Sequence, residues 1–171
     1  MFHVLWFRRF VVILGIDPGI ERVGYGILEI ESAKRRAVQK VGWGCIETSS
    51  RTPHADRLAE IYRQISQLIK KVKPKIVGVE KLFFFKNAKT ALSVSEARGV
   101  ILLSLANEKI PIVEFTPLQV KQTLTNYGRA DKRQIQTMVK MTLGLTEAPK
   151  PDDAADALAI AICALRKLPR N

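Results

Sequence analysis

An unbroken apolar run that ends in a carboxylate constrains the fold of this chain most strongly. Residues 11–16 are apolar throughout and rich in β-branched side chains, which is typical of a strand buried on both faces of a sheet. Asp17 follows, and a Pro-Gly pair then breaks the strand. A second apolar run, residues 76–79, also ends in an acid, Glu80. The pattern predicts a layered α/β fold whose strands deliver carboxylates to one edge of a sheet.

Hydrophobic periodicity divides the rest of the chain into further elements. Strands are expected over residues 11–17, 23–31, 36–47, 75–80 and 111–115, and helices over residues 54–72, 88–107, 117–123, 131–143 and 153–167. The first three strands follow one another through short turns and form an antiparallel meander. The two later strands follow helices, which favours a parallel arrangement beside the first strand. The expected fold class is therefore α/β, with a mixed sheet of three antiparallel and two parallel strands flanked by helices on both faces.

Length and cysteine usage narrow the class of protein. A chain of 171 residues is expected to form one domain, here over residues 11–171. Residues 1–10 lack the order of charge and apolar core of a signal peptide, so we expect a short extension or a mis-set start codon. No apolar stretch reaches the roughly 20 residues of a membrane span. Cys45 and Cys163 lie in apolar contexts and are expected to be reduced, which indicates a cytoplasmic protein.

The charge of the chain points to an anionic partner. Lys and Arg number 28 against 16 Asp and Glu, and the formal net charge is +12. DNA, RNA or a membrane surface would fit this excess, and a solvated basic surface with no partner is the plain alternative. A basic chain that also carries carboxylates at the ends of buried elements favours a metal-dependent enzyme that acts on a polyanion. Nucleic acid is the first candidate for this polyanion.

A third acidic site opens the last helix. Asp153 and Asp156 are three residues apart and share a helix face, but Asp152 and Asp156 are four apart and share one too. Spacing alone does not choose between the two pairs, and Asp152 is favoured as the helix N-cap. Several carboxylates brought together repel one another unless a proton or a cation intervenes, and oxygen ligands select hard ions such as Mg²⁺ or Mn²⁺. The alternative is that each acid separately serves a turn, a strand end or a helix dipole.

Four segments of the chain, in this order, resemble the RuvC family of bacterial Holliday junction resolvases. They are Ile16–Gly19, Val79–Glu80 followed by Phe83 and Lys86–Asn87, Thr116–Gln122, and Asp153–Ala159. The resemblance covers about residues 11–166 and implies the ribonuclease H-like fold. It implies that Asp17, Glu80, Asp153 and Asp156 are catalytic acids that bind Mg²⁺, with Mn²⁺ as a substitute, and it selects Asp153 over Asp152.

The resemblance also implies roles for residues that bind DNA. Phe83 would contact bases at the junction, Lys121 would serve both catalysis and DNA binding, and Lys132 would bind DNA. Judged from the residues alone, the aromatic rings at positions 83–85 also suit core packing. A basic run near the site would hold the DNA backbone, although such a run is more often a solvated face. Its members are Lys121, Arg129, Lys132, Arg133 and Lys140.

The function that the resemblance implies is a homodimeric endonuclease that cuts two like-polarity strands of a Holliday junction during recombination and repair. Four-way junction DNA and the branch-migration proteins RuvA and RuvB are its implied partners. A two-fold symmetric dimer presents two identical sites, and the helix over residues 88–107 is the candidate dimer surface, with plain core packing as the alternative. Two other functions stay open: a ribonuclease H-like nuclease that cuts RNA–DNA hybrids, and a junction-binding module without catalysis.

Overall fold

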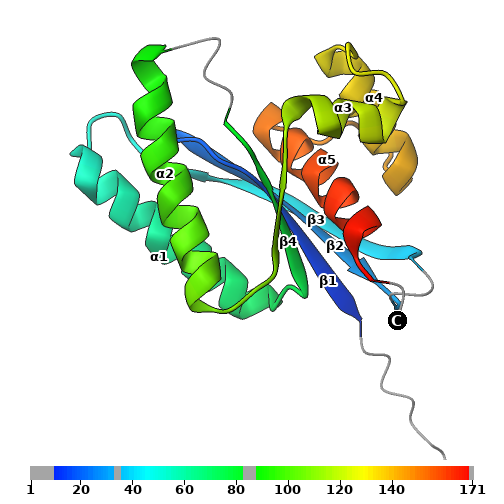
Figure 1. Cartoon of the computed structure of the whole chain (residues 1–171), viewed down its shortest axis with the longest axis horizontal. Coiled ribbons are helices and arrows are strands. Elements are labelled where there is room, and N and C mark those ends of the chain that lie inside the picture. The colour runs from blue at the N-terminus through cyan, green and yellow to red at the C-terminus, as the bar shows by residue number, and fades with distance from the viewer. Residues whose placement is uncertain (1–9, 33–35, 83–87, 170–171) are drawn as a thin grey trace, which may run out of the picture.

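The described part of the chain contains one five-stranded mixed sheet, which is the core of the architecture in Figure 1. The structure is a computed structural model that describes residues 10–32, 36–82 and 88–169. The strands are β1 (Val11–Asp17), β2 (Arg22–Ile30), β3 (Val38–Glu47), β4 (Ile76–Glu80) and β5 (Ile112–Phe115), in the spatial order β3-β2-β1-β4-β5. The first three pair antiparallel, whereas β4 runs parallel to β1 and β5 runs parallel to β4. The expected mixed sheet is confirmed.

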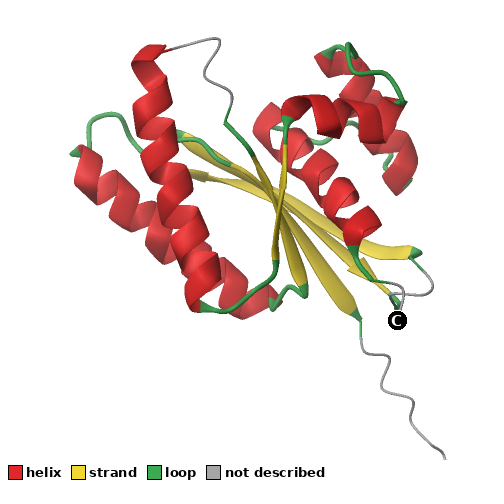
Figure 2. Ribbon diagram, in the orientation of Figure 1, coloured by secondary structure: helices red, strands yellow, loops and turns green. Residues whose placement is uncertain are grey.

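Helices cover both faces of this sheet, as Figure 2 shows. One face is covered by α1 (His54–Val72) and α2 (Ala88–Asn107). The other face carries α5 (Asp152–Lys167), against which α3 (Pro117–Thr125) and α4 (Lys132–Leu143) pack. All ten elements begin and end within two residues of the bounds expected from the sequence. Within the residues that the structure describes, no helix has the length and hydrophobicity needed to cross a membrane.

The alternation of side chains along β1 and β4 determines the face of the sheet to which their terminal acids point. On β1, Ile13 packs into the core beneath α5, whereas Leu14 packs into the core beneath α1 and α2. Asp17 therefore points to the α5 face, four residues after Ile13. On β4, Ile76 packs beneath α5, so Glu80 points to the same face. The two strands are parallel neighbours that end level with each other, which brings both carboxylates to one place.

Four glycines on this face let α5 lie directly against the strands. They are Gly15 on β1, Gly24 and Gly26 on β2, and Gly78 on β4. A Cβ atom at Gly15 would lie 2.1 Å from the carbonyl oxygen of Ala157, and one at Gly24 would lie 2.1 Å from the carbonyl oxygen of Asp153. Any side chain at these positions would push the helix away from the sheet. Close approach of the α5 backbone therefore explains the glycines at positions 24 and 26.

A methyl group added at Gly15 tests this packing. We expect Gly15→Ala to lower the free energy of unfolding by about 1–3 kcal/mol, because the new Cβ has to displace helix backbone rather than a flexible side chain. Urea unfolding measures the difference. Gly42→Ala is the matched control, because a Cβ there meets only the Ile27 side chain, at 3.8 Å. The control should stay within about 0.5 kcal/mol of the unmodified protein. Equal losses in both variants would contradict the close contact.

Candidate active site

The four expected acids converge at one end of the sheet. Asp17 ends β1 and Glu80 ends β4, while Asp153 and Asp156 lie in the first two turns of α5. The pKa of Asp17 is raised well above its usual value, first by burial and then by the charges of Glu80, Asp156 and Asp153. Each of the other three acids therefore lies within electrostatic reach of Asp17. The structure brings all four together, as the pattern of strand and helix ends predicts.

The pKa values of two further carboxylates in this group, Glu80 and Asp156, are also raised. Burial, followed by the charge of Asp156, raises the pKa of Glu80 to about 7. Burial also raises the pKa of Asp156, against the opposing effect of Lys132. Ionised carboxylates that lie close together repel one another, and a cation bound among them stabilises their charged form. The arrangement is therefore electrostatically prepared for a positive charge.

Lys132 on α4 supplies part of that charge. Its Nζ atom lies 3.5 Å from Oδ2 of Asp156 and 3.1 Å from Oδ2 of Asp152. Burial acts to lower the pKa of Lys132, but the neighbouring aspartates outweigh it and raise the pKa. A cavity of about 210 Å³ is lined by Glu80, Asp156, Lys121 and Lys132, among other residues. The two expected lysines thus share one cavity with two of the expected acids.

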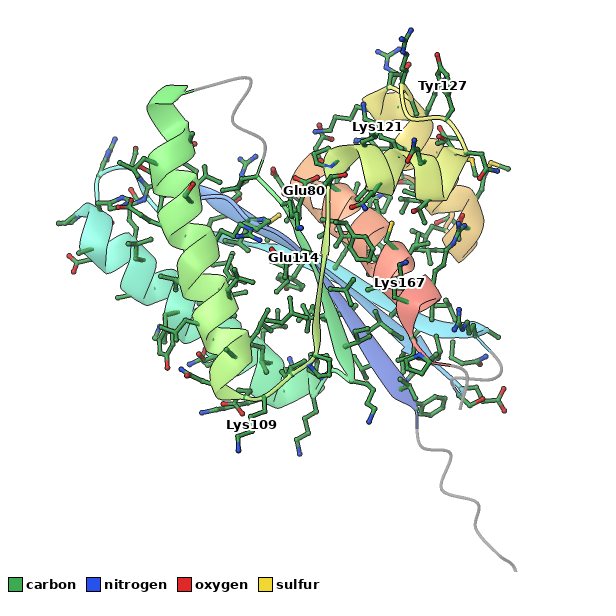
Figure 3. All side chains as sticks on the ribbon, in the orientation of Figure 1. Glu80, Lys109, Glu114, Lys121, Tyr127 and Lys167 are labelled. Atoms are coloured by element: carbon green, nitrogen blue, oxygen red, sulfur yellow. The ribbon has the colours of Figure 1, made fainter. Side chains whose placement is uncertain are left out.

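Lys121 reaches this cavity from α3, and Figure 3 shows Lys121 on α3 at the same end of the sheet as Glu80. The start of α3 is well defined, because the Thr116 side chain accepts a hydrogen bond from the Gln119 amide and the Gln119 side chain accepts one from the Thr116 amide. This capping box follows directly after β5, so the sheet itself positions Lys121. Phe83, the expected contact to bases, lies outside the described residues.

The N-cap role expected for Asp152 is wrong. Pro151 occupies the N-cap position without a side-chain hydrogen bond, and Asp152 is the first residue of α5. Its carboxylate accepts a hydrogen bond from Nε2 of Gln136 at 2.9 Å and pairs with Lys132. Asp153, by contrast, contributes to the raised pKa of Asp17. The geometry therefore separates the two aspartates that spacing left equivalent, and it places Asp153 in the acidic group.

Arg22, at the start of β2, is a neighbour of the site that sequence reasoning missed. Its Nη1 atom lies 3.8 Å from Oδ2 of Asp153, and its Nε atom donates to Oε1 of Glu47 at 3.2 Å. A cavity of about 690 Å³ adjoins Asp153 on this side and is lined by the β1–β2 turn and the loop after β3. The chain carries no local signal for this contact, because the arginine and Asp153 meet only through the packing of α5 on β2.

The donor set of the acidic group fits a hard divalent cation. Its members offer only carboxylate oxygens, the ligands that Mg²⁺ and Mn²⁺ prefer. In the ranges 10–32, 36–82 and 88–169, however, no three Asp, Glu, His or Cys side chains stand close enough to enclose an ion in their present rotamers. Binding would therefore require the carboxylates to turn toward one another, away from contacts such as the pair between Asp156 and Lys132.

Comparison with known proteins identifies the family. The sequence profile described as crossover junction endodeoxyribonuclease RuvC matches residues 13–164. The chain belongs to the RuvC family. Crossover junction endodeoxyribonuclease RuvC of Caldicellulosiruptor saccharolyticus is 52% identical to this chain over 151 residues, which cover 88% of this chain and 90% of the relative. Family membership makes the chain an endodeoxyribonuclease, as the resemblance in its motifs implies.

Two solved structures of RuvC from Thermus thermophilus share the fold. One superposes with a TM-score of 0.79 at 35% identity and covers 89% of this chain and 92% of its own. The other is T. thermophilus RuvC in complex with Holliday junction substrate, with a TM-score of 0.75 at 34% identity, covering 89% of this chain and 90% of its own. The expected ribonuclease H-like architecture of the RuvC family is confirmed.

The raised pKa of Glu80 predicts how stability depends on pH without divalent metal. The folded pKa of Glu80 is about 7 against an ordinary value of 4.5, so the stability that protonated Glu80 contributes is present below about pH 4.5 and is lost as pH rises through 7. Glu80→Gln stays neutral, so we expect it to gain about 1–3 kcal/mol over the unmodified protein at high pH and nothing in acid. Urea unfolding in EDTA from about pH 4 to 8 measures this difference. A difference that does not change with pH would contradict the prediction.

Proposed function

We propose that this protein resolves Holliday junctions by metal-dependent hydrolysis of one phosphodiester in each of two like-polarity strands, in recombination and DNA repair. The observation that carries the proposal is the convergence of Asp17, Glu80, Asp153 and Asp156 at one edge of the sheet. The basic character of the chain suits a polyanionic substrate. A RuvC protein solved with Holliday junction substrate, at 34% identity and with the same fold, supports the junction as that substrate.

The four acids are assigned as ligands of Mg²⁺, with Mn²⁺ as a substitute. Such an ion, when bound, polarises the phosphate and lowers the pKa of water. Lys121 and Lys132 line the same cavity as Glu80 and Asp156, so both are assigned to the phosphate backbone. Lys121 would in addition stabilise negative charge that develops on the phosphate in the transition state. The contact of Phe83 with bases at the junction stays a prediction.

A homodimer through α2 is part of the proposal. The outer face of this helix exposes Leu92, which is 69% exposed, and Leu103, which is 56% exposed, and open space surrounds Gly99 between them. The inner face buries Ala97 and Ile101 in the core. Core packing, the alternative to a dimer surface, therefore accounts for the inner face only. A dimer with two-fold symmetry would present two identical sites to a junction with the same symmetry.

The remaining expectations about partners and location stay predictions. RuvA and RuvB are proposed as partners because branch migration brings junctions to a resolvase. A cytoplasmic location is supported by Cys45 and Cys163, which are both free thiols. The single nuclease domain over residues 11–171 is supported by the shared sheet, whose two faces carry the two cores. Residues 1–9 lie outside the described part of the chain.

Asp17→Asn tests the proposed chemistry. We expect paired nicks on a mobile four-way junction in Mg²⁺, no nicks in EDTA, and a loss of at least about 10³-fold in the variant, because it removes the most buried charge of the site. Junction binding in EDTA should persist, since the substitution removes one negative charge. Cleavage is followed by gel electrophoresis under single-turnover conditions.

Asp152→Asn is the matched control for Asp17→Asn. Its carboxylate lies at the edge of the same acidic segment, but it bonds to Gln136 and Lys132 and is exposed, so cleavage should change little. Linear duplex and an RNA–DNA hybrid complete the substrates. Cleavage of the hybrid in preference to the junction would favour another ribonuclease H-like activity. Tight junction binding without cleavage in Mg²⁺ or Mn²⁺ would favour a binding module.

Leu103→Glu tests the dimer surface. A charge in place of an exposed leucine of α2 should convert the dimer to a monomer, and paired nicks should give way to single, uncoupled ones. Sedimentation velocity measures the mass, and circular dichroism shows whether the monomer is folded. Met141→Glu is the control, because Met141 on α4 is 69% exposed but lies away from α2. A dimer that survives Leu103→Glu would refute this surface.

A further inference from the structure

The peptide bond that follows Glu80 is held from both sides. Its N–H, which belongs to Lys81, donates to the carbonyl oxygen of Phe115 at 2.8 Å. Its carbonyl oxygen, which belongs to Glu80, accepts a hydrogen bond from Nε of Arg98 at 3.0 Å. Glu80 is the last residue of β4, and it pairs with Phe115, the last residue of β5. The two bonds therefore define the backbone orientation from which the Glu80 carboxylate projects.

The same guanidinium makes a second contact. Nη2 of Arg98 forms an ion pair with the carboxylate of Glu114 on β5, and the Arg98 side chain is only 19% exposed. Glu114 pairs with Val79 across the β4–β5 ladder, one residue before Glu80. Figure 3 shows Glu80 and Glu114 on the strands between α2 and α3. A single side chain from α2 thus holds the ends of two neighbouring strands.

We propose that Arg98 is a positioning residue for the metal site, which sets the direction of the Glu80 carboxylate and ties it to α2. This inference rests on the proposed metal-dependent function. Arg98 acts through geometry, since its Nε atom bonds the backbone carbonyl oxygen of Glu80 and its Nη2 atom pairs with Glu114, and neither of these contacts involves the Glu80 carboxylate. The geometry requires an arginine, because Nε and Nη2 reach two acceptors at once in a fixed plane, whereas a lysine offers one mobile ammonium.

The test compares Arg98→Lys and Arg98→Gln with the unmodified protein. Mn²⁺ binding without DNA is followed by electron paramagnetic resonance of the free ion, and cleavage is measured against metal concentration. We expect both variants to weaken Mn²⁺ binding and to raise the half-saturating metal concentration by about 10–100-fold. Junction binding in EDTA should not change, because Arg98 is assigned no contact with DNA. Arg63→Gln is the control, since Arg63 pairs with Glu60 on the outer surface of α1.

Unchanged Mn²⁺ binding in folded Arg98 variants would overturn the proposal and leave Arg98 as a structural contact. Full rescue by lysine would also overturn it, because charge alone would then suffice. If neither Arg98 variant folds, Glu114→Ala decides, because it removes the second anchor of the guanidinium and should raise the half-saturating metal concentration to a smaller extent. Unchanged metal dependence in Glu114→Ala would then overturn the proposal.

Failure of the proposed function gives a different result. In that case Asp17→Asn would bind Mn²⁺ as the unmodified protein does, and the unmodified protein would not cut the junction at any metal concentration. Failure of the Arg98 proposal alone leaves junction cleavage and the Asp17→Asn defect intact. The two hypotheses therefore fail in separate experiments.

Discussion

Helix α5 can lie against the sheet only because the strand positions that face it carry no side chain. At Gly15 and Gly24 the missing Cβ atoms would fall within 2.1 Å of helix carbonyl oxygens, so the contact is between backbones. Asp153 and Asp156 reach Asp17 as a consequence, because they lie at the end of the helix that this contact holds down. The distances among the acids are therefore set by packing in the apolar core, and not by attraction among the acids themselves.

Packing has to hold these side chains together because electrostatics drives them apart. Burial and mutual repulsion raise the pKa values of Asp17, Glu80 and Asp156, so ionisation of the group opposes folding. Lys132 offsets part of this cost through its contacts with Asp152 and Asp156. A divalent cation would offset more of it, and any ion that binds only the folded state also stabilises that state. Metal affinity and fold stability are therefore linked, because both depend on the repulsion among these carboxylates.

Local sequence patterns predict much of this fold, and their failures have physical reasons. The period-two and period-3.6 patterns locate all ten elements, and Asp131 caps α4 through a capping box with Gln134. Asp152 fails as an N-cap because Pro151, with its extended backbone, takes that position without offering a side-chain acceptor. The contacts of Arg22 and Arg98 had no local signal at all. Their partners lie on other elements, and only tertiary packing brings them within reach.

The two faces of α2 give the site a mechanical link to the proposed dimer. The inner face sends Arg98 to the last peptide of β4, and the outer face exposes Leu92 and Leu103. A helix is stiff over this length, so a partner that docks on the outer face fixes the helix that holds Glu80. In a two-fold dimer the spacing of the two acidic groups would then follow from the helix contact alone. Two cuts on a symmetric junction need that spacing to be constant. The Arg98 guanidinium on each α2 would link the position of the helix to the position of Glu80 in the same site.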